Sequence, residues 1–332
     1  MKKRNYETDL MKIISSFMVV LLHTAAMGPV LTTEKGFIIN TFFNCITRFC
    51  VPVFVMISGF YMLEREENIS YYIKRALKYF LVMLLWSIVY LLKYTFTDLV
   101  EIKNIKEAVY FLLTQPGHLW YFYAIAALTL FTPLMSFFSR NADKKTYLYT
   151  MTLMFIMGCV ITPLIKDNSQ SLLGQITEKT KIGSIMAFPF YYMFGYYVRR
   201  FGTDKKISVF SLFTGLLLTL IITEIYSFKE GTLYLNSLSF FAFNTALFAM
   251  GFFSFFSSLK IRENIFLKLI APLTGGIYGF HIIVVPSVYY RINGFVPSFL
   301  AVPVGAVISF VISAAAVWIW KKLKCVFKKE LK

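Results

Sequence analysis

Asp-Leu-Met-Lys-Ile-Ile-Ser-Ser-Phe-Met-Val-Val-Leu-Leu-His is the sequence of residues 9–23, and this stretch decides the fold. It is apolar enough to begin a membrane span, yet it carries Lys12 near its start and His23 deep inside, and both are unfavourable in hydrocarbon. Eleven helical steps of 100° return to within about 20° of the starting direction, so the two side chains share one face, separated by roughly 16 Å of rise. We therefore predict that this face points into a helix bundle and away from lipid.

The composition of the whole chain indicates an integral membrane protein. Of its 332 residues, 58% are hydrophobic and 15% are charged, which is more apolar surface than one water-soluble core buries. The net charge of +17 does not indicate nucleic-acid binding, because the lysines and arginines stand in short clusters between apolar runs and form no continuous basic face. We expect the lipid bilayer as a partner and no nucleic acid.

Apolar windows of about twenty residues predict an all-α bundle of ten transmembrane helices. The predicted spans lie near residues 9–30, 37–63, 74–96, 118–138, 146–165, 182–201, 207–228, 234–256, 267–290 and 296–320. Residues 102–117 are too short and too charged to span, and they predict an interfacial helix at the outer surface. Because no segment between the spans is long enough for a separate soluble domain, we expect one membrane-embedded domain over residues 1–332.

The distribution of basic residues orients this predicted bundle. Most of the 34 lysines and arginines lie at alternate ends of the spans, on the side that also holds the N-terminus. Since cytoplasmic loops carry the excess of Lys and Arg, both termini are predicted to be cytoplasmic, in a multi-pass protein of the cytoplasmic membrane. The basic start resembles a signal peptide, but Glu7, Asp9, Lys12 and His23 interrupt that pattern, so we expect a retained first helix.

Arg48 lies deep in the second predicted span. An arginine at this depth is costly unless it meets a carboxylate, backbone carbonyls or an anionic ligand, which makes Arg48 a candidate site residue. In the same span, Pro52 lacks an amide donor and is expected to kink the helix. Ser58 and Gly59 are small and are expected to permit the close approach of a neighbouring helix.

Arg75 and Lys78 are three residues apart, so they are neighbours on one helical face at the cytoplasmic rim, where they could clasp a phosphate group. Charge that only sets the membrane orientation explains these two residues about as well.

His23 also has two interpretations: a structural histidine that is hydrogen-bonded to a neighbouring helix, or a group that exchanges a proton near neutral pH. Lys12 in turn could simply snorkel to the rim without binding a ligand.

Other polar or aromatic groups inside or beside the apolar runs are further candidates. Trp120 and Tyr121 open the fourth span, where an aromatic belt is expected in any case. Glu224 in the seventh span is a possible counter-ion for Arg48 or for a histidine, and Tyr278 and His281 lie in the ninth span. The four cysteines have neither a disulfide framework nor metal-ligand spacing, so we expect no bound metal.

Six of these stretches, taken in order, resemble the membrane acyltransferase-3 family. They are Asp-Leu-Met-Lys at 9–12 with His23 and the following threonine, Val-Pro-Val-Phe-Val-Met-Ile-Ser-Gly at 51–59, Arg-Ala-Leu-Lys at 75–78, His-Leu-Trp-Tyr at 118–121, Phe-Gly-Tyr-Tyr-Val-Arg-Arg at 194–200 and Gly-Ile-Tyr-Gly-Phe-His at 276–281. The resemblance covers essentially the whole chain. It implies a bundle of about ten helices and, as for many members, O-acetylation of a cell-surface glycan with acetyl-CoA from the cytoplasm.

The resemblance also implies roles for the candidate residues. The phosphates of acetyl-CoA or another acyl-CoA would bind to Lys12, Arg75 and Lys78, and His23 would act as general base on the acceptor hydroxyl or carry the acyl group transiently. Arg48 would polarise the thioester carbonyl or balance the developing oxyanion. Acceptor-site or supporting roles remain for the other candidates, namely Trp120, Tyr121, Glu224, Tyr278 and His281.

Two positions depart from the family pattern. The usual arginine, separated from the histidine by ten intervening residues, is Lys12 here, and the second basic residue of the Arg-x-x-Arg pair is Lys78. Lysine keeps the charge but loses the bidentate fork, so it fixes phosphate geometry less tightly.

Two other function classes compete with the enzyme. An exporter of a glycan or lipid intermediate would use the polar face of the first helix as a translocation path and would bind no acyl-CoA. A regulatory or scaffold subunit would need Lys12 and His23 only for folding. We found no pair of matching broken helices in the two halves of the chain, which counts against the exporter.

Overall fold

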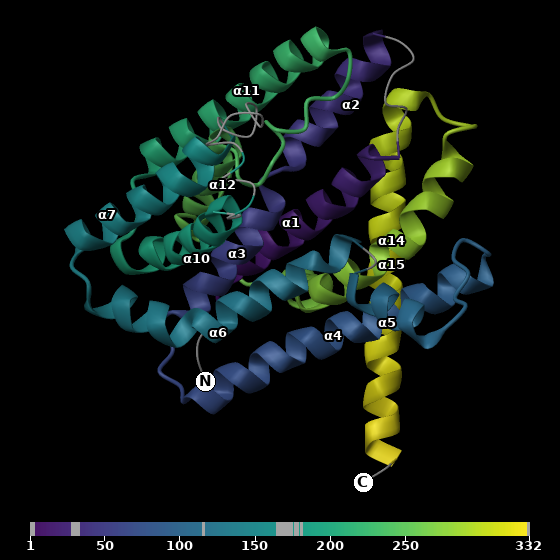
Figure 1. The fold of residues 1–332 in the computed structure, drawn as a ribbon, viewed down its shortest axis with the longest axis horizontal. Coiled ribbons are helices and arrows are strands. Elements are labelled where there is room, and N and C mark those ends of the chain that lie inside the picture. Colours follow the sequence, from purple (N-terminus) through teal and green to yellow (C-terminus); the bar gives the residue numbers. More distant parts are fainter. Residues whose placement is uncertain are drawn as a thin grey trace. The chain divides into compact units, whose positions relative to one another are not determined.

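The computed structural model describes residues 4–27, 34–114, 117–163 and 182–330, together with Gln175 and Lys179. All regular secondary structure in these residues is helical (Figure 1). The chain divides into two compact units. Unit 1 comprises Met1–Phe60 and Asp143–Lys332, and unit 2 comprises Tyr61–Ala142. Seven helices in the described part of the chain are long and apolar enough to cross a membrane. The multi-pass helical class is therefore confirmed, while the count of ten spans and the orientation of the termini stay predictions.

Unit 1 holds most of the helices. They are α1 (Tyr6–Ala25), α2 (Glu34–Thr47), α3 (Cys50–Met62, whose last two residues belong to unit 2), α7 (Lys144–Phe155), the π-helix η2 (Ile156–Ile161), α10 (Ile182–Phe201), α11 (Lys205–Glu230), α12 (Phe243–Ser257), α13 (Ile265–Ile270), η3 (Ala271–Leu273), α14 (Thr274–Ile292) and α15 (Ser298–Glu330).

Helix α1 lies against α14 and α15, which run beside each other (Figure 1). Its apolar side buries Val20, Leu21 and Ala25 in one cluster with residues of both helices, among them Ile277 of α14 and Val302 of α15. Burial on this scale fixes the rotation of α1, because each apolar side chain would lose its packing if the helix turned. This side of α1 is therefore packed inside the bundle, whereas the predicted inward direction of the face that carries Lys12 and His23 is not decided by these contacts.

The beginning of α1 is anchored by polar contacts. Asn5 caps the helix by accepting from the Thr8 amide at 2.7 Å, which satisfies one of the free donors of the first turn. The Glu7 carboxylate accepts from the Ile261 amide at 3.0 Å, and Tyr6 Oη donates to Glu263 at 2.9 Å. These contacts tie the start of α1 to the segment between α12 and α13. Hydrogen bonds from Lys268 and Tyr6 in turn hold the pKa of the exposed Glu263 below its usual value.

The second predicted span, 37–63, is broken rather than continuous. Helix α2 ends at Thr47 and α3 begins at Cys50, so the break falls at Arg48 and Phe49. Pro52 explains the position, because it has no amide to donate to the Arg48 carbonyl four residues earlier. The kink that Pro52 predicts is thus confirmed.

Helices α3 and α10 cross at two glycines. A Cβ atom on Gly59 would lie 1.8 Å from the Tyr192 carbonyl oxygen, and one on Gly195 would lie 1.9 Å from the Met56 carbonyl oxygen. Each backbone therefore occupies the space that a side chain on the other helix would need. The expected close approach at Gly59 is confirmed, with α10 as the neighbour.

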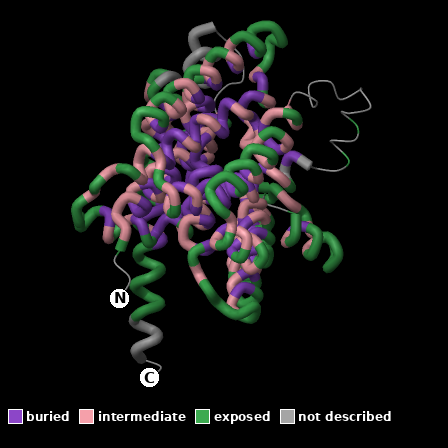
Figure 2. Tube along the Cα trace, turned by 90° about the vertical axis from the view of Figure 1, so that its left-hand side faces the viewer, coloured by how far each residue is buried: buried purple, intermediate pink, exposed green. Residues whose placement is uncertain are grey.

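Two other helices have ends that differ from those of the predicted spans. The span at 234–256 is helical only from Phe243 onward, because Ser237 and Asn244 make local polar contacts: the Asn244 amide donates to the Ser237 carbonyl at 2.8 Å. The last helix extends past the predicted end at 320 to Glu330. Its final turns up to Cys325 are exposed (Figure 2).

Unit 2 is built from α4 (Ile69–Phe96), α5 (Ile105–Thr114), η1 (Gly117–Leu119) and α6 (Trp120–Asn141). Helix α4 packs on α6, and α5 packs on α4. The predicted short helix within 102–117 is confirmed as α5. Helix α4 begins five residues before the predicted boundary at 74, because the Asn68 side chain accepts from the Tyr71 amide at 2.9 Å and caps it.

Candidate functional site

Lys12 is held by a carboxylate on its own helix. Its Nζ donates to Asp9 Oδ1 at 3.1 Å, and the Asp9 side chain is only 7% exposed whereas that of Lys12 is 29% exposed. The same carboxylate accepts from Arg4 Nε at 2.5 Å. Sequence reasoning used Asp9 as a break in a signal-peptide pattern and as part of the Asp-Leu-Met-Lys stretch, without assigning it a contact. Its spacing of three residues from Lys12 was the signal that could have identified it as the partner of this lysine.

His23 and His281 lie next to each other although they come from opposite ends of the chain. Their ring centroids are 5.0 Å apart with an interplanar angle of 49°. His23 on α1 is partly buried, and His281 on α14 is fully buried. The structure thus brings together two of the histidines that the sequence marked as separate candidates.

The His281 ring is fixed by its own helix. Its Nδ1 lies 2.8 Å from the Tyr278 carbonyl oxygen and 3.1 Å from that of Ile277. Two carbonyl acceptors require a donor between them, so the proton of the neutral imidazole is on Nδ1 and Nε2 carries the lone pair. The Tyr278 ring centroid is 6.1 Å from that of His281. Tyr278, another sequence candidate, therefore belongs to the same cluster.

Buried hydroxyl groups continue this polar face. Ser15 and Ser16 lie on α1 between Lys12 and His23, and Tyr289 lies on α14 two turns beyond His281. Their side-chain oxygens are buried and have no hydrogen-bond partner among the described residues. A buried hydroxyl without a partner costs on the order of 1–3 kcal/mol, so these groups favour a polar ligand or water beside them. Sequence reasoning missed all three.

Arg48 binds to the broken end of α2. Its Nε donates to the Asn44 carbonyl oxygen at 3.0 Å, and its Nη2 donates to Asn44 Oδ1 at 2.6 Å. A cation is favourable at this position because the last carbonyls of a helix lack amide donors. Among the described residues no ion pair joins Arg48 to Glu224. Asn44 at the end of α2, and not Glu224, is therefore the partner of the Arg48 guanidinium.

Arg75 and Lys78 both lie on α4 in unit 2, but their environments differ. Arg75 is partly buried, its Nη1 donates to Tyr71 Oη at 3.2 Å, and its guanidinium lies 5.6 Å from the centroid of the Tyr79 ring. Lys78 is exposed and forms no ion pair among the described residues. These two residues therefore present one fixed and one mobile cation to the surface of unit 2.

A family model described as an acyltransferase domain matches residues 5–318. The chain belongs to the acyltransferase-3 family. No curated protein and no solved structure matches it. The match covers both units and contains every candidate residue, so the resemblance is confirmed and a multi-pass membrane acyltransferase is supported.

Trp120 and Tyr121 form the first turn of α6 in unit 2 of this acyltransferase. Both are partly buried, and their ring centroids are 6.3 Å apart in an edge-to-face arrangement. The preceding His118 packs on Tyr90 with ring centroids 5.0 Å apart. These contacts give the segment a structural role within unit 2, and its proposed acceptor-site role stays a prediction.

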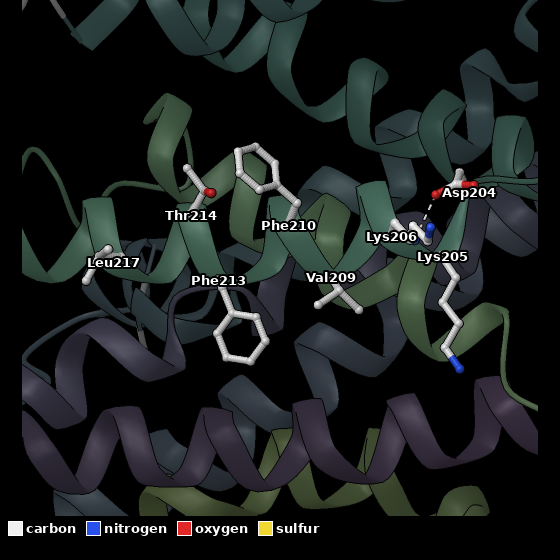
Figure 3. Close-up of a pocket in the computed structure, with 8 residues that line it drawn as sticks. All are labelled: Asp204, Lys205, Lys206, Val209, Phe210, Phe213, Thr214 and Leu217. Carbon is white, nitrogen blue, oxygen red and sulfur yellow. Dashed lines mark hydrogen bonds between the residues drawn. The ribbon is translucent and has the colours of Figure 1, made fainter.

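Two hollows on unit 1 of the acyltransferase lie elsewhere. One of about 590 Å³ is lined by ends of α7, α10, α11 and α12, including Tyr197, Ser208 and Ser254. The other, of about 890 Å³, is lined by one face of α11, from Asp204 to Leu217 (Figure 3). Phe210 and Phe213 on that face are more than half exposed, as expected for a helix side that faces lipid. None of the sequence-predicted site residues lines either hollow.

Proposed function

We propose that this protein transfers an acetyl group, or another short acyl group, from acyl-CoA to a hydroxyl of a cell-surface glycan or of its lipid-linked precursor, in the cytoplasmic membrane of a bacterium. The single observation that carries the proposal is the 5.0 Å distance between the ring centroids of His23 and His281, with Lys12 on the same helix as His23. The family match supports acyl transfer, and the donor and acceptor are our proposals.

In the proposed reaction, His23 takes the proton from the acceptor hydroxyl. The hydroxyl oxygen then attacks the thioester carbonyl carbon, a C–O bond forms, and the C–S bond breaks. The thiolate of CoA leaves and recovers the proton from His23, so the histidine returns to its neutral state. His281, with its proton fixed on Nδ1, presents Nε2 as an acceptor that can hold an N–H of His23.

The acyl-CoA donor is expected to bind through its charged phosphates and through the amide-containing chain that joins them to the thioester. Lys12 supplies a cation on α1, and the roughly 16 Å of helix rise between Lys12 and His23 suits an elongated donor. The hydroxyls of Ser15 and Ser16 between them favour a chain with amide groups over a purely apolar one, because they lack partners in the described structure. In unit 2, Arg75 and Lys78 are proposed to bind phosphate.

Arg48 is proposed to stabilise the negative charge that develops on the thioester oxygen. Its bonds to Asn44 use Nε and Nη2, which leaves further guanidinium donors for that oxygen.

The test is a labelling experiment on membranes that contain the protein. They are incubated with acetyl-CoA carrying a radiolabelled acetyl group, and label is measured on protein, on lipid-linked sugar and on polymer. Label on a glycan or on its lipid-linked precursor supports the proposal. If export proceeds without any label transfer, the glycan exporter is the better interpretation.

A further inference from the structure

Two arginine side chains of unit 2 meet on one tyrosine hydroxyl. Arg65, in the loop before α4, donates from Nη1 to Tyr71 Oη at 3.0 Å. Arg75, on α4, donates from Nη1 to the same oxygen at 3.2 Å. The two guanidinium nitrogens are therefore no farther apart than the sum of these distances, and both lone pairs of the phenol oxygen are used.

This arrangement brings two like charges together with little local compensation. Glu67 lies 3.8 Å from Arg65 Nη1, which is close to the outer limit of an ion pair, and Glu66 is paired with Arg140 at 2.5 Å. Arg75 has no carboxylate partner among the described residues. Repulsion between the two guanidinium groups favours an anion that both can contact.

Arg75 also has a donor that the protein does not use. Its Nε is buried and has no hydrogen-bond partner in the described part of the chain. The ring of Tyr79 holds the guanidinium from one side at 5.6 Å. A charged donor that is fixed in orientation and left without an acceptor is what an oxyanion site requires.

Ordinary topogenic charge does not explain this pair. Lys74 and Lys78 on the same helix are exposed, as residues that only set membrane orientation are expected to be. Arg65 and Arg75 are instead partly buried and turned toward one oxygen.

We propose that Arg65 and Arg75, positioned by Tyr71, form a phosphate-binding site. Arg65 supplies the second cation of this site, a role that the sequence pattern assigns to Lys78. Two planar forks match the tetrahedral oxygens of a phosphate group better than one fork and one mobile ammonium. That the phosphate belongs to the nucleotide end of acyl-CoA rests on the proposed function.

The experiment measures binding without turnover. The purified full-length protein in detergent is titrated with adenosine 3′,5′-bisphosphate, which carries phosphates but no thioester, and the heat of binding gives Kd. Arg65→Gln and Arg75→Gln are each expected to raise Kd at least about tenfold, since a charge-assisted hydrogen bond is lost. Arg65→Lys, which keeps the charge, is expected to show most of that loss, and Lys78→Gln is expected to have a smaller effect than Arg65→Gln.

Lys74→Gln is the matched control, because it removes the same unit charge from an exposed position on α4 and is expected to leave Kd near the wild-type value. Thermal unfolding of each variant verifies folding, and Arg65→Lys carries the test if Arg65→Gln does not fold. Wild-type Kd in both Arg65 variants would overturn the site, as would an equal loss in Lys74→Gln or no binding by the wild type.

Failure of the site and failure of the proposed function give different results. A protein that binds the bisphosphate in an Arg65-dependent manner but transfers no acetyl group retains the phosphate site and loses the acyltransferase proposal. A protein that transfers acetyl while Arg65→Gln binds normally retains the enzyme and loses the site.

Discussion

His23 on α1 and His281 on α14 place their imidazole centroids 5.0 Å apart, and the second ring is held by backbone carbonyls of its own helix. The His281 ring is fixed and fully buried, whereas the His23 ring is partly buried, so the two histidines suit different roles. In the proposed reaction, His23 exchanges a proton with the substrate while His281 orients the His23 ring.

The first prediction tests whether His23 is the general base. His23→Ala and His23→Gln are both expected to reduce acetyl transfer by about 10²–10⁴-fold, because neither side chain can act as a base near neutral pH. Transfer is measured to the native glycan and normalised to protein in the membrane. Wild-type transfer by His23→Gln would show that His23 is a structural hydrogen bonder and not the base.

The second prediction tests the positioning role of His281. An asparagine amide reaches about as far as Nδ1, and a glutamine amide reaches about as far as Nε2. We therefore expect His281→Gln to retain more transfer than His281→Asn, with both more active than His23→Ala. If His281→Asn matches the wild type, His281 has no positioning role in the reaction.

The third prediction concerns Lys12 and the carboxylate that holds it. Lys12→Arg keeps the cation and should retain much of the activity, whereas Lys12→Glu should abolish use of the donor by repelling its phosphates. Asp9→Asn removes the partner at 3.1 Å and should raise the acetyl-CoA concentration needed for half-maximal transfer. An unchanged donor dependence in Lys12→Glu would assign Lys12 to ordinary rim charge.

The fourth prediction concerns the crossing of α3 and α10. Gly59→Ala should lower the free energy of unfolding by about 1–3 kcal/mol, because its methyl group would meet the Tyr192 carbonyl. Gly275→Ala is the control, since a Cβ there has no atom within 4 Å. Thermal unfolding in detergent compares the two. Equal midpoints would mean that the helices can separate at this point at no cost.

The fifth prediction tests the topology. Reporters fused after Lys145, Lys206 and Lys260 are expected in the cytosol, and reporters after Lys35, Lys181 and Lys229 outside. The fusions at Lys229 and Lys260 are the most demanding pair, because α12 between them has only 15 residues. Its rise of about 22 Å is shorter than a bilayer core of about 30 Å. The same location for both reporters would remove α12 as a span, and a cytosolic Lys181 reporter together with a cytosolic Lys145 reporter would remove the predicted span at 146–165.

Much of the helical architecture could be read from the sequence because it depends on local features. Apolar runs define the helices, and Asn68 at the start of α4 shows how a short polar side chain sets a boundary by capping. The difference at 234–256 arises where local hydrogen bonds overrule average hydropathy, and the last helix continues beyond its apolar run in exposed, charged turns.

The candidate site divides in the same way. The sequence by itself determined that Lys12 and His23 share one face of a membrane helix, since the helical repeat fixes that relation without any neighbour. It did not determine that His281 would stand beside His23, that Gly195 would meet α3, or that Arg65 would share the Tyr71 hydroxyl with Arg75. Those relations depend on how helices rotate and cross and on the path of a loop. Only the packing of the folded chain decides them, because side-chain contacts between elements are set by the shape of both partners at once.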